Sequence, residues 1–244
     1  MSVAMTATAA SVTRLARLDA ARGVAVIAMV VYHLAWDLSH FGIIATNVGL
    51  DPVWKSFAQA IAASFLAIAG ISLERATQDG IRWRPFLKRL AVLILAALAI
   101  TIVTWVVFPF SYIFFGILHC IALSSLLALA FRRWPVWALT GAGLIVFILP
   151  RVFRTPLLDA PIFDFVGLGT VTPVSNDYEP LFPWFAWVLW GMALARLRPG
   201  LLETGTAPAW LQALGRWSLP IYLVHQPLLF GCLMLLARLE VLPV

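Results

Sequence analysis

The chain has 244 residues, of which 62% are hydrophobic and 11% are charged, with a formal net charge of +6 and a mean hydropathy of +0.95. A soluble domain typically carries about 25% charged residues, and its core could not hide this much apolar surface, so the composition excludes an ordinary soluble domain and indicates an all-α helix bundle in a lipid bilayer. The basic residues stand in short clusters between apolar runs, so we expect them to set the topology rather than to bind nucleic acid.

Seven apolar runs approach the length of about 20 residues that a transmembrane helix needs. In chain order we expect transmembrane helices near residues 21–43, 53–73, 87–108, 111–131, 134–150, 181–197 and 217–238. They form one polytopic domain over residues 1–244. The second helix presents Ala60, Ala63, Ala67 and Gly70 at small-residue spacing, which favours close packing against another helix.

The placement of basic residues predicts the orientation of the bundle. With the N-terminus in the cytoplasm, the cytoplasmic ends of the helices hold thirteen of the seventeen basic residues: Arg14, Arg17, Arg22, Arg75, Arg82, Arg84, Lys88, Arg89, Arg132, Arg133, Arg196, Arg198 and Arg216. The positive-inside rule therefore predicts an N-in, C-out protein with the long connection 151–180 on the outer side. We expect it in a bacterial-type cytoplasmic (inner) membrane.

The first helix is the richest in ionisable groups, which are costly inside a membrane and usually functional. His33 and Asp37 are four residues apart and share one helix face. A carboxylate beside an imidazole favours a general base, although such a pair can also simply fill a gap between helices. Arg22 lies eleven residues before His33, about 16 Å along the axis; it either clamps a phosphate group at the cytoplasmic end or only sets the topology.

Two later helices carry further candidate residues. His119, on the fourth helix, is expected at a depth similar to that of His33, so that both imidazoles flank one cavity. Tyr222, His225 and Gln226 precede Pro227, which is expected to bend the last helix. These three side chains either line a polar pocket or satisfy the bent backbone.

Asp177 and Glu179 stand at the outer mouth of the sixth helix. They are either solvated acids or part of a lip that binds the hydroxyl or amine of an acceptor. We expect no metal site, because neither cysteine has partners at ligand spacing.

Six segments together form a specific pattern: RLDAARG, MVVYHLAWDL, SFLAIAGISL, FGILHCIALSSLL, YEPLFPWFAWVLWGMAL and LGRWSLPIYLVHQPLL. From about Arg14 to Pro227 the chain resembles the heparan-α-glucosaminide N-acetyltransferase catalytic-domain family in its short bacterial form. The spacing of Arg22 and His33 is also similar to the arginine–histidine pair in the first helix of acyltransferase family 3. Both families are grouped as transmembrane acyltransferases.

The resemblance implies a transferase that moves an acetyl or similar acyl group from cytoplasmic acetyl-CoA to a sugar or glycoconjugate acceptor across the membrane. It implies that His33 is the catalytic histidine, oriented by Asp37, and that Arg22 contacts CoA. It also implies that His119 and His225 belong to the same polar cavity. Direct base catalysis and an acyl-imidazole relay through His33 both remain open.

A polytopic transporter or proton-coupled channel is the main alternative, because it also needs ionisable side chains inside its helices. A retinal photoreceptor is excluded, since the only lysines, Lys55 and Lys88, lie at helix ends. The sequence is compatible with a monomer or an oligomer.

Overall fold

The computed structural model describes residues 16–200 and 206–239, and all regular elements in these ranges are helices. The expected all-α class is therefore confirmed, and each of the seven expected spans overlaps a helix. Arg14 lies outside the described residues. The seven long helices are α1 (Ala16–His40), α2 (Pro52–Thr77), α3 (Trp83–Val107), α4 (Ile117–Phe131), α5 (Val136–Val152), α6 (Leu181–Leu197) and α9 (Ser218–Arg238). Three short elements complete the fold: η1 (Pro156–Leu158), η2 (Pro161–Phe163) and α8 (Ala209–Arg216).

Four of these helices, α1, α2, α3 and α9, are long and apolar enough to cross a membrane. A helix of 25 residues such as α1 measures about 38 Å, which exceeds a hydrocarbon core of about 30 Å. The apolar helices α4, α5 and α6 are shorter, with 15, 17 and 17 residues. An integral membrane protein is thus supported, whereas seven spans and the N-in, C-out orientation stay predictions.

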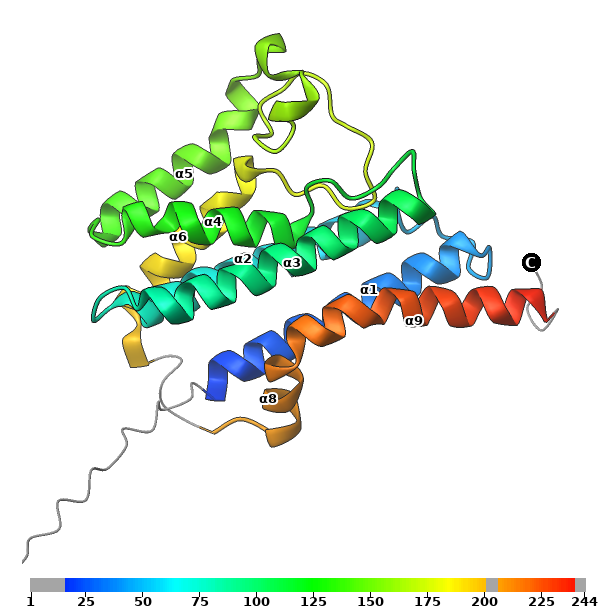
Figure 1. Ribbon diagram of the computed structural model, residues 1–244, viewed down its shortest axis with the longest axis horizontal. Coiled ribbons are helices and arrows are strands. Elements are labelled where there is room, and N and C mark those ends of the chain that lie inside the picture. Colours follow the sequence, from blue (N-terminus) through cyan, green and yellow to red (C-terminus); the bar gives the residue numbers. More distant parts are fainter. Residues whose placement is uncertain (1–15, 201–205, 240–244) are drawn as a thin grey trace, which may run out of the picture.

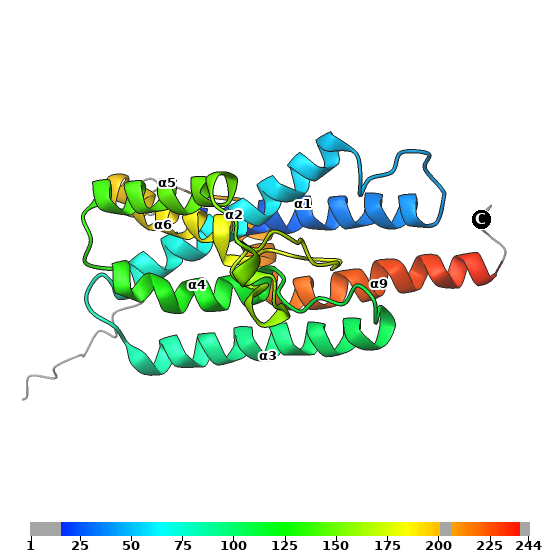
Figure 2. The same cartoon turned by 90° about the horizontal axis from the view of Figure 1, so that it is seen from above.

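The helices alternate in direction, which gives the bundle two ends (Figure 1). We call one the basic end: it holds the starts of α1, α3 and α5 and the ends of α2, α4 and α6. The other is the loop end, with the start of α2, the end of α9 and the long connection 153–180. Figure 2 shows α9 beside α1, and these two helices pack together.

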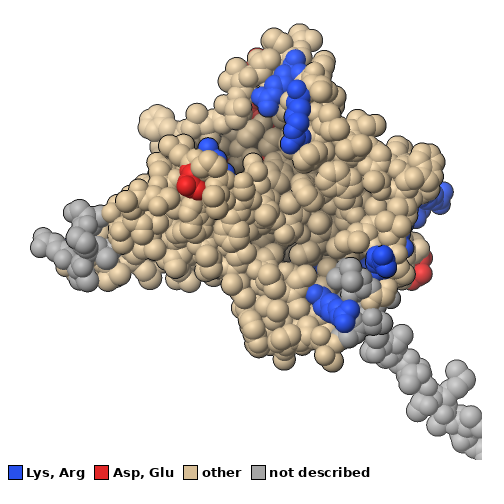
Figure 3. Space-filling model, turned by 180° about the vertical axis from the view of Figure 1, so that it is seen from behind, with Lys and Arg blue, Asp and Glu red and all other residues tan. Residues whose placement is uncertain are grey.

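The surface between the two ends is apolar. Figure 3 shows Lys, Arg, Asp and Glu gathered toward the ends and margins of the molecule, with a broad uncharged area between them. On α3, the side chains of Leu95, Ile102 and Val106 are 66%, 61% and 73% exposed. A contiguous surface of this kind is unfavourable in water and favourable against lipid chains.

Helices α2 and α6 approach each other closely enough to require glycine. A Cβ on Gly70 would lie 2.1 Å from the carbonyl oxygen of Val188, and a Cβ on Gly191 would lie 2.2 Å from that of Ala67. The expected close-packing face of α2 is therefore confirmed for Ala67 and Gly70, and its partner is α6.

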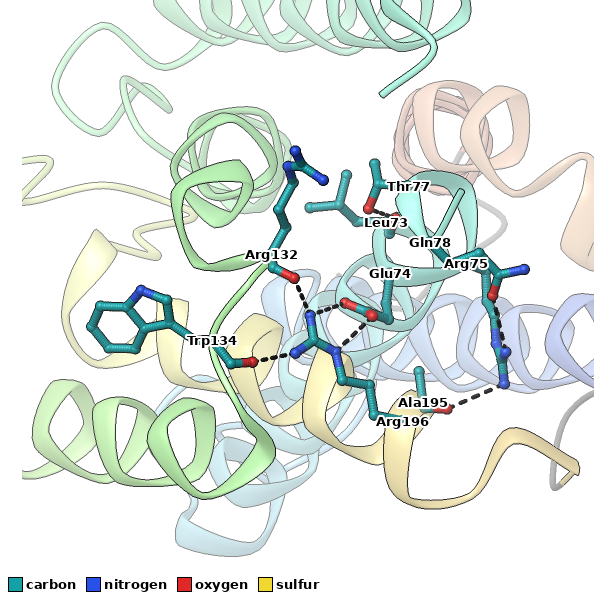
Figure 4. A network of polar contacts seen from close by, with 9 residues as sticks. All are labelled: Leu73, Glu74, Arg75, Thr77, Gln78, Arg132, Trp134, Ala195 and Arg196. Carbon is teal, nitrogen blue, oxygen red and sulfur yellow. Dashed lines mark hydrogen bonds and ion pairs between the residues drawn. The ribbon is translucent and has the colours of Figure 1, made fainter. Parts of the chain in front are cut away.

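At the basic end, an ion pair and hydrogen bonds connect α6 to α2 and to the turn between α4 and α5 (Figure 4). The Arg196 guanidinium donates two hydrogen bonds to the Glu74 carboxylate, at 2.6 and 2.8 Å. It also donates to the backbone carbonyls of Arg132 and Trp134 in the turn between α4 and α5. The Arg196 side chain thus pairs with the Glu74 charge on α2. It also satisfies carbonyl groups just after α4 that have no partner within a helix.

The fourth helix begins at Ile117, six residues later than expected, because residues 108–116 form an irregular connection containing Pro109 and ending at Gly116. This connection pairs with the segment before α6. Asn176 N–H donates to the carbonyl of Ser111 at 2.9 Å, and Glu179 N–H donates to that of Phe115 at 3.1 Å. Two irregular segments therefore satisfy each other's backbone groups and fix the position of residues 176–179.

Candidate active site

Polar side chains of α1 and α9 meet where the two helices pack. The rings of His33 and His225 are 4.8 Å apart between centroids. The Gln226 amide donates to Asp37 Oδ1 at 2.7 Å. Together with Tyr222, whose backbone carbonyl lies 2.7 Å from His225 Nδ1, these residues form what we call the histidine cluster: His33, Asp37, Tyr222, His225 and Gln226.

The tautomer of His225 follows from its partner. A carbonyl can only accept a hydrogen bond, so the contact with the Tyr222 carbonyl places the proton on Nδ1. In the neutral ring, Nε2 of His225 is then an acceptor. His33 is held by ring contacts with His225 and with Tyr32, whose centroid is 5.4 Å away.

Asp37 shares a helix face with His33, as expected, but its hydrogen bond goes to α9. Its side chain is fully buried, and among the described contacts its partner is Gln226 rather than His33. Sequence spacing places two side chains on one face of α1, whereas the packing of α9 against that face decides which group the carboxylate meets. Asp37 therefore couples the two helices directly.

Three buried atoms of the histidine cluster have no hydrogen-bond donor among the described residues: Asp37 Oδ2, His225 Nε2 and Gln226 Oε1. All three are acceptors, counting the carboxylate in its ionised form and His225 in the tautomer above. Each buried acceptor without a donor costs about 1–3 kcal/mol. A group carrying O–H or N–H bonds is the chemical complement of this cluster.

Asp177 joins the loop end to the histidine cluster. Its Oδ2 accepts a hydrogen bond from Ile117 N–H at 3.0 Å, at the N-terminus of α4, and lies 3.5 Å from the Tyr222 hydroxyl. Burial raises the pKa of the Asp177 carboxyl, against the opposing effect of these two hydrogen bonds. Asp177 is therefore the first-turn cap of α4 as well as a neighbour of the histidine cluster.

Glu179 follows two residues later in the same segment. It lines a cavity of about 290 Å³ at the loop end, and its Oε2 is buried without a hydrogen-bond partner among the described residues. Burial, and then the nearby Asp177 charge, raise the pKa of the Glu179 carboxyl well above its ordinary value. The two acids that the sequence groups together also lie near the same aromatic side chains, because both interact electrostatically with Tyr32 of α1 and Tyr222 of α9.

His119 lies on α4 with both ring nitrogens engaged. Gly116 N–H donates to Nδ1 at 3.3 Å, and Nε2 lies 3.2 Å from the Thr101 hydroxyl of α3. No contact described in residues 16–200 and 206–239 joins His119 to His33. These bonds tie α3 to α4, and a substrate-binding role for His119 stays a prediction that no described contact supports.

Arg22 lies inside the bundle toward the basic end. Its guanidinium donates to Asp19 at 2.8 Å and to the Ser72 hydroxyl of α2. It also interacts electrostatically with Arg89 of α3. Arg89 and Arg82 line a cavity of about 130 Å³ between α2, α3 and α4. Two like charges near one another suit an anionic ligand at this end.

Sequence reasoning missed some side chains that line these cavities. At the loop end these are Gln59, Arg154, Asp164, Tyr178 and Trp184; four of the five lie in or beside the long connection, where no spacing rule brings residues together. Within the described ranges, no group of three His, Cys, Asp or Glu residues could hold a metal ion.

Comparison with known proteins yields one family. The model of the family described as "Heparan-alpha-glucosaminide N-acetyltransferase, catalytic" matches residues 14–227. The match covers most of the chain and includes the histidine cluster, Arg22 and the long connection. No curated protein and no solved structure matches the chain.

Proposed function

We propose that this chain, which belongs to the heparan-alpha-glucosaminide N-acetyltransferase catalytic family, moves an acetyl or similar acyl group from acyl-CoA at the basic end to a sugar or other hydroxyl or amine acceptor at the loop end. The family indicates a membrane acetyltransferase. The observation that carries the rest is the set of buried acceptor atoms beside two imidazoles in the histidine cluster. An acceptor O–H or N–H fits these atoms.

The donor is proposed to bind with its phosphate groups at the basic end. Arg22, Arg82 and Arg89 supply positive charge there, and guanidinium groups suit phosphate oxygens. Arg22 and His33 are separated by about 16 Å along α1. An extended acyl-pantetheine arm running along α1 from the arginines would carry the thioester toward the imidazoles.

The acyl transfer is proposed to use the histidine cluster as its base. An imidazole, His33 in our assignment, removes the proton from the acceptor hydroxyl or amine as that oxygen or nitrogen forms a bond to the acyl carbon. The carbon–sulfur bond breaks, CoA leaves as the thiolate, and the imidazolium returns the proton to it. Asp37 and Gln226 hold α1 against α9 so that both rings stay together. A covalent acyl-imidazole at His33 is the variant of this route.

Heat protection by CoA tests the donor site in the purified protein. A ligand that binds only the folded state stabilises it by about 2.7 kcal/mol at 100 times its Kd. We expect desulfo-CoA, which carries the phosphates without the reactive thiol, to raise Tm. We expect Arg22→Gln to weaken this protection at least tenfold in apparent affinity, because a guanidinium contact to phosphate is lost.

Arg238→Gln is the matched control, since Arg238 is exposed at the opposite end of the bundle. It should keep the full protection. Ion flux through proteoliposomes without any protection by desulfo-CoA would instead support the transporter alternative and contradict the transferase.

A further inference from the structure

The short helix α8 lies beside the long helices at the basic end. It spans Ala209–Arg216, between the end of α6 and the start of α9. Figure 1 shows α8 next to the first turns of α1, extending away from the direction in which α1 and α9 run. It packs mainly on α1 and also touches α9. A short helix in this position, at the end of membrane-spanning helices and across them, lies in the plane of the bilayer surface.

Two glycines fix α8 on α1. A Cβ on Gly215 of α8 would overlap the backbone carbonyl oxygen of Asp19, and a Cβ on Gly23 of α1 would overlap that of Leu211. The two backbones therefore touch at two points, which are about one turn apart on each helix. Because this packing holds the helix in one orientation, it also fixes the directions in which the other side chains of α8 point.

The part of α8 that α1 does not cover carries two tryptophans. Trp210, in the first turn, is 61% exposed, and Trp217, directly after the last residue, is 63% exposed. Seven residues correspond to nearly two full turns, so both indole rings leave the helix on the same side. Arg216, the residue before Trp217, is exposed as well. Two indole rings and a guanidinium thus lie beside one another on the surface.

This surface lies at the level where the uncharged area of the molecule begins. Just beyond the contact of Gly23 with α8, Val24 and Ile27 of α1 are 56% and 39% exposed. Indole rings favour the boundary between lipid headgroups and acyl chains, because the ring packs on the chains while its N–H reaches polar groups. The position of Trp210 and Trp217 therefore matches that boundary.

The charge around α8 is complementary to an anionic lipid. Arg17 and Arg216 are exposed at the basic end, whereas the acids Asp19 and Glu74 at this end are already paired with arginines. Basic side chains at a membrane surface attract anionic headgroups, and a guanidinium binds phosphate oxygens with two hydrogen bonds. A zwitterionic headgroup carries the same phosphate but adds a positive group, which is unfavourable beside this excess of positive charge.

We propose that α8 is an interfacial helix whose Arg216 binds the phosphate of an anionic phospholipid, with Trp210 and Trp217 packed against the acyl chains of the same leaflet. This lipid site goes beyond the proposed acyl transfer, because it uses neither the arginines assigned to CoA nor the histidine cluster. It accounts for a helix that is tightly packed on α1 and still leaves two indole rings uncovered.

Thermal unfolding of the full chain in detergent, with added lipid, tests the headgroup contact. We expect phosphatidylglycerol to raise Tm more than phosphatidylcholine with the same acyl chains. Arg216→Gln should weaken this effect at least threefold in apparent affinity, and Arg216→Lys, which keeps the charge, should retain more of it. Arg133→Gln is the matched control, because it removes an exposed arginine at the same end, in the turn between α4 and α5. It should keep the full effect.

Tryptophan fluorescence in nanodiscs tests the position of the two indole rings. Lipids brominated near the headgroup end of their acyl chains quench the indole rings that touch them. We expect Trp210→Phe and Trp217→Phe each to lower the amount of fluorescence that is lost when brominated lipid replaces the unbrominated lipid.

Equal effects of the two headgroups on the wild-type protein, or equal losses in Arg216→Gln and Arg133→Gln, would overturn the lipid site. Fluorescence from Trp210 and Trp217 that bromine does not quench would overturn it too. So would a dimer that Trp210→Phe dissociates, since a second copy of the chain would then cover this surface. Acetyl transfer is not part of any of these measurements, so the lipid site and the proposed function can fail separately.

Discussion

At the scale of single residues, backbone pairing fixes the segment that carries two buried acids. Asp177 and Glu179 lie in the segment that pairs with residues 111–115. The Asp177 carboxylate accepts a hydrogen bond from Ile117 N–H at the N-terminus of α4 and lies near the Tyr222 hydroxyl, and Glu179 is one of the residues that line the cavity at the loop end. Burial raises the pKa of both.

This raised pKa makes stability depend on pH. Between the ordinary Glu value of 4.5 and the raised folded value, the folded protein binds more protons at Glu179 than the unfolded chain does. The free energy of unfolding should therefore fall as the pH rises through this interval. We expect Glu179→Gln to flatten the fall, measured as Tm in detergent against pH. An unchanged slope in this variant would show that Glu179 is not the group that titrates.

The residue-level predictions succeeded where they needed only helix geometry. The shared face of His33 and Asp37 follows from their spacing. The pairing of Asp37 with Gln226 does not, because it depends on how α9 packs 189 positions later in the chain. The Thr101 partner of His119 was missed for the same reason.

At the scale of elements, hydropathy predicted where the long helices lie in the sequence but not which helices pack against each other. Apolar runs predict helices in a bilayer because the backbone must bond to itself there. The packing of α2 on α6, and not on a sequence neighbour, depends on which small residues face each other. The eight-residue helix α8 was missed because it is too short for a membrane span. It packs closely on α1, where Gly23 lies against the backbone of Leu211.

The close contact of α2 and α6 can be tested with one methyl group. Gly70→Ala would place its Cβ 2.1 Å from the Val188 carbonyl oxygen, and such overpacking typically costs about 1–3 kcal/mol. We expect a lower Tm for this variant. Gly141→Ala in α5 is the control, because its Cβ meets nothing within 4 Å; it should leave Tm unchanged or slightly raised. Equal losses in both variants would argue against the close packing of α2 on α6.

At the scale of the whole molecule, the two ends differ in chemistry and the histidine cluster lies between them. The basic end carries Arg22, Arg82 and Arg89, and the loop end carries the cavity of about 290 Å³. The uncharged area between the ends suits a bilayer (Figure 3). The N-in, C-out orientation would place the arginines in the cytoplasm, where acyl-CoA is available, and the loop-end cavity on the opposite side.

Acetyl transfer by the reconstituted protein tests the central claim most directly. Purified protein in proteoliposomes is given radiolabelled acetyl-CoA and a panel of methyl glycosides and amino alcohols, and labelled products are counted. We expect product with the wild-type protein and a rate at least about 100-fold lower with His33→Ala, since a positioned base contributes about 10²–10⁴-fold. Protection of the variant by desulfo-CoA shows that it is folded. The same rate in folded His33→Ala, or no labelled product from the wild-type protein with any acceptor, would contradict acyl transfer at the histidine cluster.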